Sequence, residues 1–196
     1  LVIVANPRDV MTDGASLTAK VDSKRVVGMA GIMDTAPYRA ILAEEMNVSR
    51  KEIQAMLMGG HGDSMVPLHR YTTVGGIPET KLNDEDKRNA IVERTKKGGG
   101  EIVNLLGTSA WYAPGAAAAQ MVEAIVRDQR RVFPCCAWLT GEYGVNDLYL
   151  GVPVILGKNG IERIIELDLN DDEKALLATS ETAVRDVKHV LDGLSL

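Results

Sequence analysis

Two apolar runs near the start of the chain constrain its fold most. Residues 1–5 are apolar without alternation, and residues 25–31 are nearly so. Such runs are typical of parallel strands that are buried on both faces. Residues 9–20 between them can form a helix, which predicts a right-handed strand–helix–strand unit. Two parallel strands do not make a stable sheet, and no further strand–helix repeat follows. We therefore expect the sequence to begin within a domain.

A histidine between glycines is the second informative feature. Residues 59–63 read Gly-Gly-His-Gly-Asp and follow the apolar run 53–58, which predicts a buried strand that ends in a tight loop. Glycines let a ligand approach closely and leave the imidazole of His61 exposed. Histidine also has the side-chain pKa nearest neutrality, which suits proton transfer. A buried structural histidine explains the loop alone equally well.

The remaining patterns predict helices and antiparallel strands. Helices are expected at 34–47, 84–106, 114–131 and from 170 to about 194, with Asp34 as the N-cap of the first. Alternation and turn residues predict a strand and turn within 67–78 and antiparallel strands at 132–144, 148–156 and 161–167. Three glycines at 98–100 each cost roughly 1 kcal/mol inside a helix, so they indicate a kink or a close packing contact.

The composition fits one soluble globular domain or slightly more. Of 196 residues, 45% are apolar and 25% are charged, and the net charge of -5 is spread along the chain. Without a basic block, nucleic acid is not expected as a partner. No apolar run approaches the ~18 residues of a membrane helix, and no signal peptide is recognisable. Cys135 and Cys136 are adjacent, which favours buried thiols, no metal site and a reduced cytoplasmic setting.

Six motifs occur in a familiar order. They are Asn-Pro-Arg-Asp-Val-Met-Thr at 6–12, Gly-Ile-Met-Asp at 31–34, Gly-Gly-His-Gly-Asp at 59–63, Met-Val-Pro at 65–67, Ser-Ala-Trp-Tyr-Ala-Pro at 109–114 and Gly-Val-Pro at 151–153. Together they closely resemble the NAD-dependent malate dehydrogenases of the lactate-dehydrogenase-like type. The resemblance covers the whole chain but only the C-terminal part of that family.

The resemblance implies an α/β fold in two parts. Residues 1–28 would be a remnant of the NAD-binding Rossmann domain, and residues 29–196 would be the α+β catalytic domain that binds substrate. The family's glycine-rich phosphate loop, its ribose-binding acidic residue and its mobile loop with two arginines would lie upstream. No Gly-x-Gly-x-x-Gly is present in the 196 residues.

The resemblance also assigns roles to individual residues. His61 matches the proton acceptor, and Asp34 matches the carboxylate that holds the imidazole in one tautomer, although a plain N-cap is the simpler explanation of Asp34 taken alone. Asn6 matches a residue that contacts substrate and cofactor. Val4 and Ala5 would line the nicotinamide through backbone groups.

Three further polar residues are less clearly placed. Ser109 matches a position on the pocket wall, although the preceding loop is one residue short of the family pattern. His69 and His189 match no motif, and we expect both to be solvated surface residues.

One position departs from the family pattern. Three residues after the partner aspartate, the family has an arginine that grips the substrate carboxylate, and this chain has Pro37. Proline is tolerated in a first helical turn. Arg39 lies about 200° further round the helix and is not expected to replace the missing arginine.

The resemblance implies reversible NAD-dependent oxidation of malate to oxaloacetate, by a homo-oligomer (dimer or tetramer) in the cytoplasm. With Pro37 and without the nucleotide loop, the isolated chain is expected to be inactive and to bind NAD weakly. Two alternatives stay open. One is a lactate or other 2-hydroxy-acid dehydrogenase, and the other is a non-catalytic oligomerising fragment.

Overall fold

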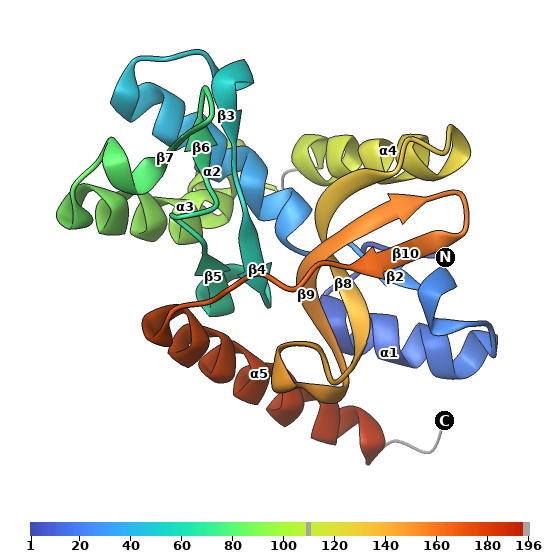
Figure 1. Cartoon of the computed structure of the whole chain (residues 1–196). Helices are drawn as coiled ribbons and strands as arrows, with labels where there is room; N and C mark the ends of the chain where they lie inside the picture. The colour runs from blue at the N-terminus through green and yellow to red at the C-terminus, as the bar shows by residue number, and fades with distance from the viewer. Residues whose placement is uncertain (109–110, 194–196) are drawn as a thin grey trace.

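The computed structural model describes residues 1–108 and 111–193. Its largest element is a five-stranded sheet in the order β1-β2-β8-β9-β10, with α1 (Arg8–Ala19) below it and α4 (Tyr112–Val126) above it in Figure 1. The strands are β1 (Val2–Ile3), β2 (Val27–Gly28), β8 (Arg131–Thr140), β9 (Asn146–Gly157) and β10 (Gly160–Ile164). Among these five strands, only β1 and β2 pair in parallel.

The parallel pair completes its sheet in a way that the sequence did not indicate. The predicted strand–helix–strand unit is present as β1, α1 and β2, and β2 then pairs antiparallel with β8 through Gly28 and Cys136. The first two strands therefore extend the later antiparallel sheet. The predicted boundary between residues 28 and 29 falls at the end of β2 and stays a prediction.

The three predicted antiparallel strands are confirmed. β8 and β9 pair along nearly their full length, and β10 continues the meander. Their inward side chains form the main core together with Met121 and Ala124 of α4, which are both fully buried. Cys135 and Cys136 are free, buried thiols, as expected.

A second core lies where the remaining elements meet. It joins α2 (Gly31–Met46) and α3 (Glu85–Leu106) to the small strands around them, through buried residues such as Tyr38, Leu42, Leu57 and Ile91. Those strands are β3 (Ile53–Gln54), β4 (Leu57–Gly59), β5 (Met65–Pro67), β6 (Thr73–Val74) and β7 (Ile77–Pro78). The last two form a hairpin where the sequence predicted a strand and a turn.

Two predicted helix bounds were wrong by three or more residues. α2 begins at Gly31 with Ala30 as its N-cap, so Asp34 is the fourth helical residue and not the cap. The helix can begin there because Gly31 has no Cβ, which would collide with the carbonyl oxygen of Leu57. α4 ends at Val126, short of the predicted 131, because Arg131 already belongs to β8.

The earlier start of α2 changes the position of Pro37. It is the seventh helical residue, beyond the first turn in which proline is tolerated. The carbonyl of Met33 therefore receives no helical N–H from position 37. The neighbouring helix α3 continues without a break through its three glycines. A Cβ added at Gly98 of α3 would lie 3.8 Å from the Cβ of Pro37. That is an ordinary van der Waals distance, and a Cβ at Gly99 or Gly100 would meet no atom within 4 Å, so the close packing contact predicted from these glycines is not found.

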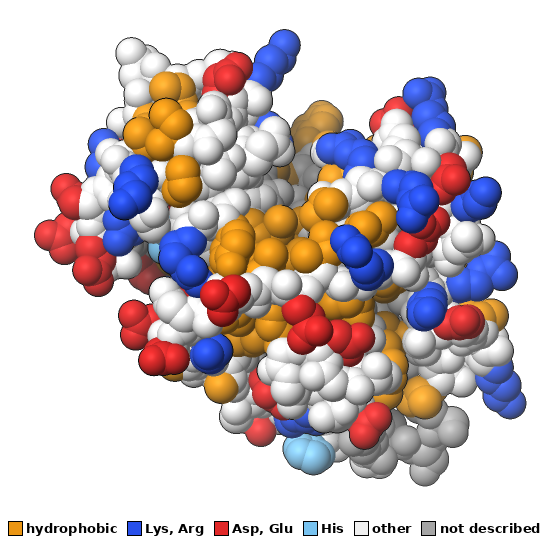
Figure 2. All heavy atoms as spheres, in the orientation of Figure 1, with side chains coloured by type: hydrophobic (Ala, Val, Ile, Leu, Met, Phe, Trp, Pro, Cys, Tyr) orange, Lys and Arg blue, Asp and Glu red, His pale blue; other side chains and the backbone are white. Residues whose placement is uncertain are grey.

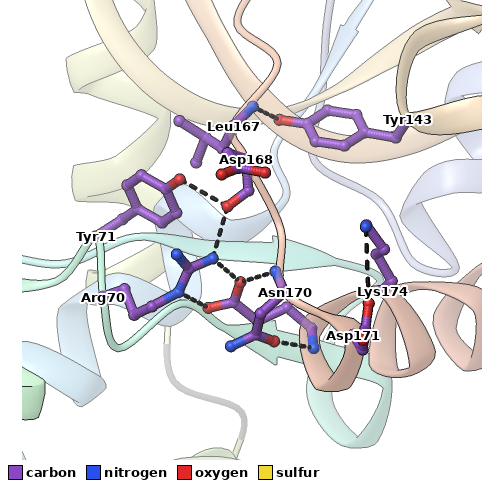
Figure 3. Close-up of polar contacts among 9 residues, drawn as sticks. Arg70, Tyr71, Tyr143, Leu167, Asp168, Asn170, Asp171 and Lys174 are labelled. Carbon is purple, nitrogen blue, oxygen red and sulfur yellow. Dashed lines mark hydrogen bonds and ion pairs between the residues drawn. The ribbon is translucent and has the colours of Figure 1, made fainter.

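α5 (Asp171–Asp192) is anchored by its first turn (Figure 3). Asn170 and Glu173 form a capping box, in which each side chain accepts the other's backbone N–H. Arg70 adds two hydrogen bonds to the Glu173 carboxylate and one to the carbonyl of Asp168. Burial opposes the charged form of Glu173, but the donors from Arg70 and Asn170 hold its pKa below the ordinary value. The loop after β5 is thereby fixed to the start of α5.

The expectation for His69 was wrong. Its Nδ1 lies 2.9 Å from Oε2 of Glu79 and 3.1 Å from the hydroxyl of Tyr38, and its side chain is only 20% exposed. Glu79 and Tyr38 are fully buried, so the histidine is part of an internal polar network. His189 on α5 is exposed, as predicted.

The outer surface mixes charges of both signs. Figure 2 shows lysine, arginine and acidic side chains interspersed around a hydrophobic band that crosses the middle of the visible face. Within residues 1–108 and 111–193, no helix combines the length and the apolar character needed to cross a membrane.

Candidate active site

The structure brings His61 and Asp34 together. Nδ1 of His61 lies 2.7 Å from Oδ1 of Asp34, and the aspartate side chain is only 7% exposed. Because a carboxylate can only accept, Nδ1–H is the donor, and Nε2 is left as a free acceptor. The imidazole itself is 34% exposed. The pair therefore offers a reachable proton acceptor that is fixed in one tautomer.

Backbone geometry explains why His61 lies beyond the end of strand β4. β4 ends at Gly59, whose φ of 75° lies in the left-handed region. A side chain at that position would also collide with Ser180 of α5. The chain can turn sharply there, and His61 follows in an extended conformation. The partner Asp34 comes from the first turns of α2, which packs against β4.

Both residues line a cavity of about 610 Å³, which is within the usual size range of small-molecule sites. Val4 and Asn6 line it from the end of β1, and their contacts with nicotinamide and substrate stay predictions. Ala5 is exposed but is not among the lining residues. Ser109 lies outside the described residues.

Pro37 also lines the cavity, one turn after Asp34 on the same face of α2. A long side chain at this position could reach into the cavity, and proline offers no donor there. Arg39 points elsewhere, because its Nη2 donates to the carbonyl of Arg50 at 2.8 Å. The expectation that Arg39 does not take the place of an arginine at position 37 agrees with this geometry.

The sequence reasoning missed Arg8, the first residue of α1. Its side chain lines the same cavity, yet the residue is only 3% exposed. Nη2 contacts Sδ of Met33 at 3.3 Å, whereas Nε and Nη1 have no hydrogen-bond partner among the described residues. Burial lowers the pKa of the guanidinium, and the carboxylates of Asp34 and Asp9 oppose this. An arginine directly after a strand-end Asn-Pro was the signal that could have found it.

Asp9 lies behind Arg8 and is itself unusual. It is 8% exposed and accepts a hydrogen bond from Sγ of Cys136 at 3.2 Å. Burial raises its pKa to about 6, although the hydrogen bond from Cys136 and the charge of Arg8 both act to lower it. The folded chain therefore holds this proton more tightly than the unfolded chain does.

This difference predicts a pH-dependent stability. Because the folded pKa is above the unfolded one, the free energy of unfolding falls as pH rises from about 4 to about 6, by up to about 3 kcal/mol. Asp9→Asn should remove that loss, stabilising the chain at neutral pH and changing little near pH 4. Urea unfolding of both proteins across this range measures it. A variant that is equally or less stable at neutral pH would contradict the expectation.

Comparison with known proteins places this geometry among dehydrogenases. Residues 32–191 match the family described as lactate/malate dehydrogenase, alpha/beta C-terminal domain. The chain is 64% identical, over 194 residues, to the malate dehydrogenase of Cytophaga hutchinsonii, covering 99% of this chain and 62% of that protein.

Solved structures show the same similarity. The malate dehydrogenase of Salinibacter ruber superposes with a TM-score of 0.93 at 56% identity, covering 97% of this chain and 64% of that one. A lactate dehydrogenase of Eimeria maxima, solved with NADH and oxamate, gives a TM-score of 0.91 at 42% identity, over 97% of this chain and 61% of that one. The chain thus spans less than two thirds of the length of these relatives.

Proposed function

Because the chain belongs to the lactate/malate dehydrogenase family, we propose that it carries the substrate site of an enzyme that oxidises malate to oxaloacetate, reversibly and with NAD. The observation that supports this best is the His61–Asp34 pair, 2.7 Å apart at the wall of a small-molecule cavity. Malate dehydrogenase is preferred to lactate dehydrogenase because the curated relative of 64% identity carries that name.

The chemistry needs a proton acceptor beside the substrate hydroxyl. Nε2 of His61 takes the hydroxyl proton as the carbonyl forms, and Asp34 stabilises the resulting imidazolium through Nδ1–H. Bound NAD would accept a hydride from the carbon that carries this hydroxyl. In the reverse direction His61 returns the proton to the oxygen of oxaloacetate. Asn6 lies at the same cavity and would hydrogen-bond the substrate.

The described residues fit one end of NAD. Val4, Met33, Ile102 and Val103 give the cavity an apolar wall, which suits a flat nicotinamide ring, and Ala5 would contribute through its backbone. No Gly-x-Gly-x-x-Gly occurs in these residues to hold the pyrophosphate. The isolated chain should therefore bind NAD weakly or not at all, and calorimetry showing micromolar affinity would contradict this.

Assembly and location belong to the same proposal. Exposed apolar side chains at Leu1, Leu105, Trp111 and Tyr112, each at least 59% exposed, would be covered in a homo-oligomer, either a dimer or a tetramer. A cytoplasmic setting fits the two reduced, buried thiols. Sedimentation at high concentration tests the first point, and a clean monomer would contradict it.

The proposed activity is tested by supplying the nucleotide-binding part. The chain is joined at Leu1 to the dinucleotide domain of a close relative, and this joined protein is assayed for NADH oxidation with oxaloacetate and with pyruvate. We expect turnover with oxaloacetate to exceed turnover with pyruvate. A reversed preference would assign the site to lactate. No turnover with either acid in a folded protein that binds NADH would favour the non-catalytic alternative.

A further inference from the structure

Burying the Arg8 guanidinium without hydrogen-bond partners costs free energy, and a ligand that accepts its N–H groups would offset this cost. A buried guanidinium with two unpartnered nitrogens is costly, because burial removes the water that would otherwise accept hydrogen bonds from them. Among the residues that the structure describes, its one hydrogen-bond acceptor is the Met33 thioether, which is weak. The chain retains this charge at 3% exposure, in the wall of the cavity that also holds His61.

The neighbouring acidic residues do not provide the missing hydrogen-bond partners. The nearby carboxylates of Asp34 and Asp9 stabilise the charge through space, but neither accepts from Nε or Nη1. Asp34 gives Oδ1 to His61, and its Oδ2 is also buried without a partner among the described residues. Arg8 therefore keeps unpartnered donors beside the proton-accepting pair.

We propose that Arg8 binds a carboxylate of the acid whose hydroxyl faces His61. This assignment rests on the proposed function and names the residue that holds the substrate. Nε–H and an Nη–H form the planar fork that a carboxylate accepts bidentately. Met33 lines the cavity too, and its flexible side chain can move aside as the stronger acceptor arrives. Pro37 offers no hydrogen-bond donor to the same cavity, so Arg8 provides the donors for the carboxylate.

Lys96 is the rival cation. It lines the cavity as well, but its Nζ lies 3.2 Å from the Glu93 carboxylate, and its side chain is 25% exposed. An ammonium that is already paired and partly hydrated gains less from a ligand carboxylate than a buried, unpaired guanidinium does. The two cations thus predict different mutational outcomes.

The direct test is nuclear magnetic resonance of the ¹⁵N-labelled 196-residue chain, with L-malate as the probe and dimethyl L-malate as the uncharged control. The Nε–H signal of Arg8, identified by its loss in Arg8→Lys, should shift saturably with L-malate and not with the ester. Arg8→Gln should weaken L-malate binding by about 10- to 100-fold. Arg39→Gln is the matched control on α2 and should leave binding unchanged.

A second measurement separates binding from a structural role. Without ligand, Arg8→Met should raise the melting temperature by a few degrees, since it removes a buried, unpaired charge, and it should also abolish L-malate binding. If Arg8 served only to stabilise the fold, Arg8→Met should instead lower the melting temperature.

Two results would overturn the assignment. One is an unmoved Arg8 signal under saturating L-malate, and the other is loss of binding in Lys96→Gln with binding retained in Arg8→Gln. Failure of the proposed function would show separately, as absence of oxaloacetate turnover in the joined protein.

Discussion

In the joined protein, His61→Gln should lower kcat/KM for oxaloacetate reduction by about 10²–10⁴, which is the usual contribution of a positioned general acid or base. Glutamine keeps a side chain of similar size but cannot deliver the proton that the new hydroxyl needs. The measurement is steady-state NADH oxidation by the parent and the variant, with NADH affinity measured alongside.

His189→Gln is the control, because His189 is exposed on α5 and lies outside the cavity. It should turn over like the parent protein. If His61→Gln retained the parent's kcat/KM while His189→Gln did too, another group would supply the proton, and the role assigned to His61 would be wrong.

Replacing Pro37 should stabilise the folded chain. Pro37→Ala restores a helical N–H for the carbonyl of Met33, removes a ring that the interior of a helix accommodates poorly, and keeps the Cβ that faces Gly98. The free energy of unfolding should rise by about 3 kcal/mol, the usual penalty of a proline inside a helix. Urea unfolding at neutral pH measures this directly.

A second proline serves as the matched control. Pro114 is the third residue of α4, where a backbone N–H has no helical partner in any case. Pro114→Ala should therefore leave the unfolding midpoint nearly unchanged. Equal midpoints for the parent and Pro37→Ala would mean that α2 already accommodates the ring without loss.

Local sequence patterns predicted the elements better than their contacts. The capping signal at Asn170 and the alternation in β8 to β10 act over a few residues, so they were visible in the sequence. The start of α2 was misplaced because it depends on how closely Gly31 packs against Leu57, a contact between distant segments. The pairing of β2 with β8 is hidden in the sequence for the same reason.

The same distinction applies to the candidate site: sequence motifs revealed some of its residues, and contacts between distant segments determine the others. The order of motifs pointed to His61 and Asp34, and the structure places them in contact. His69 was misjudged because its buried partners, Tyr38 and Glu79, come from separate elements. Arg8 was missed because its burial and its unpartnered donors arise only in the folded chain, where its side chain meets Met33 of α2.

A crystal structure of the joined protein with NADH and oxamate would test the central claim most directly. The claim is that the cavity holds a 2-oxo acid between His61 and Arg8. We expect the oxamate carboxylate to accept two hydrogen bonds from Arg8, and its carbonyl oxygen to lie about 2.6–3.2 Å from Nε2 of His61. Oxamate bound outside this cavity, or held there with its carbonyl turned away from His61, would contradict the account.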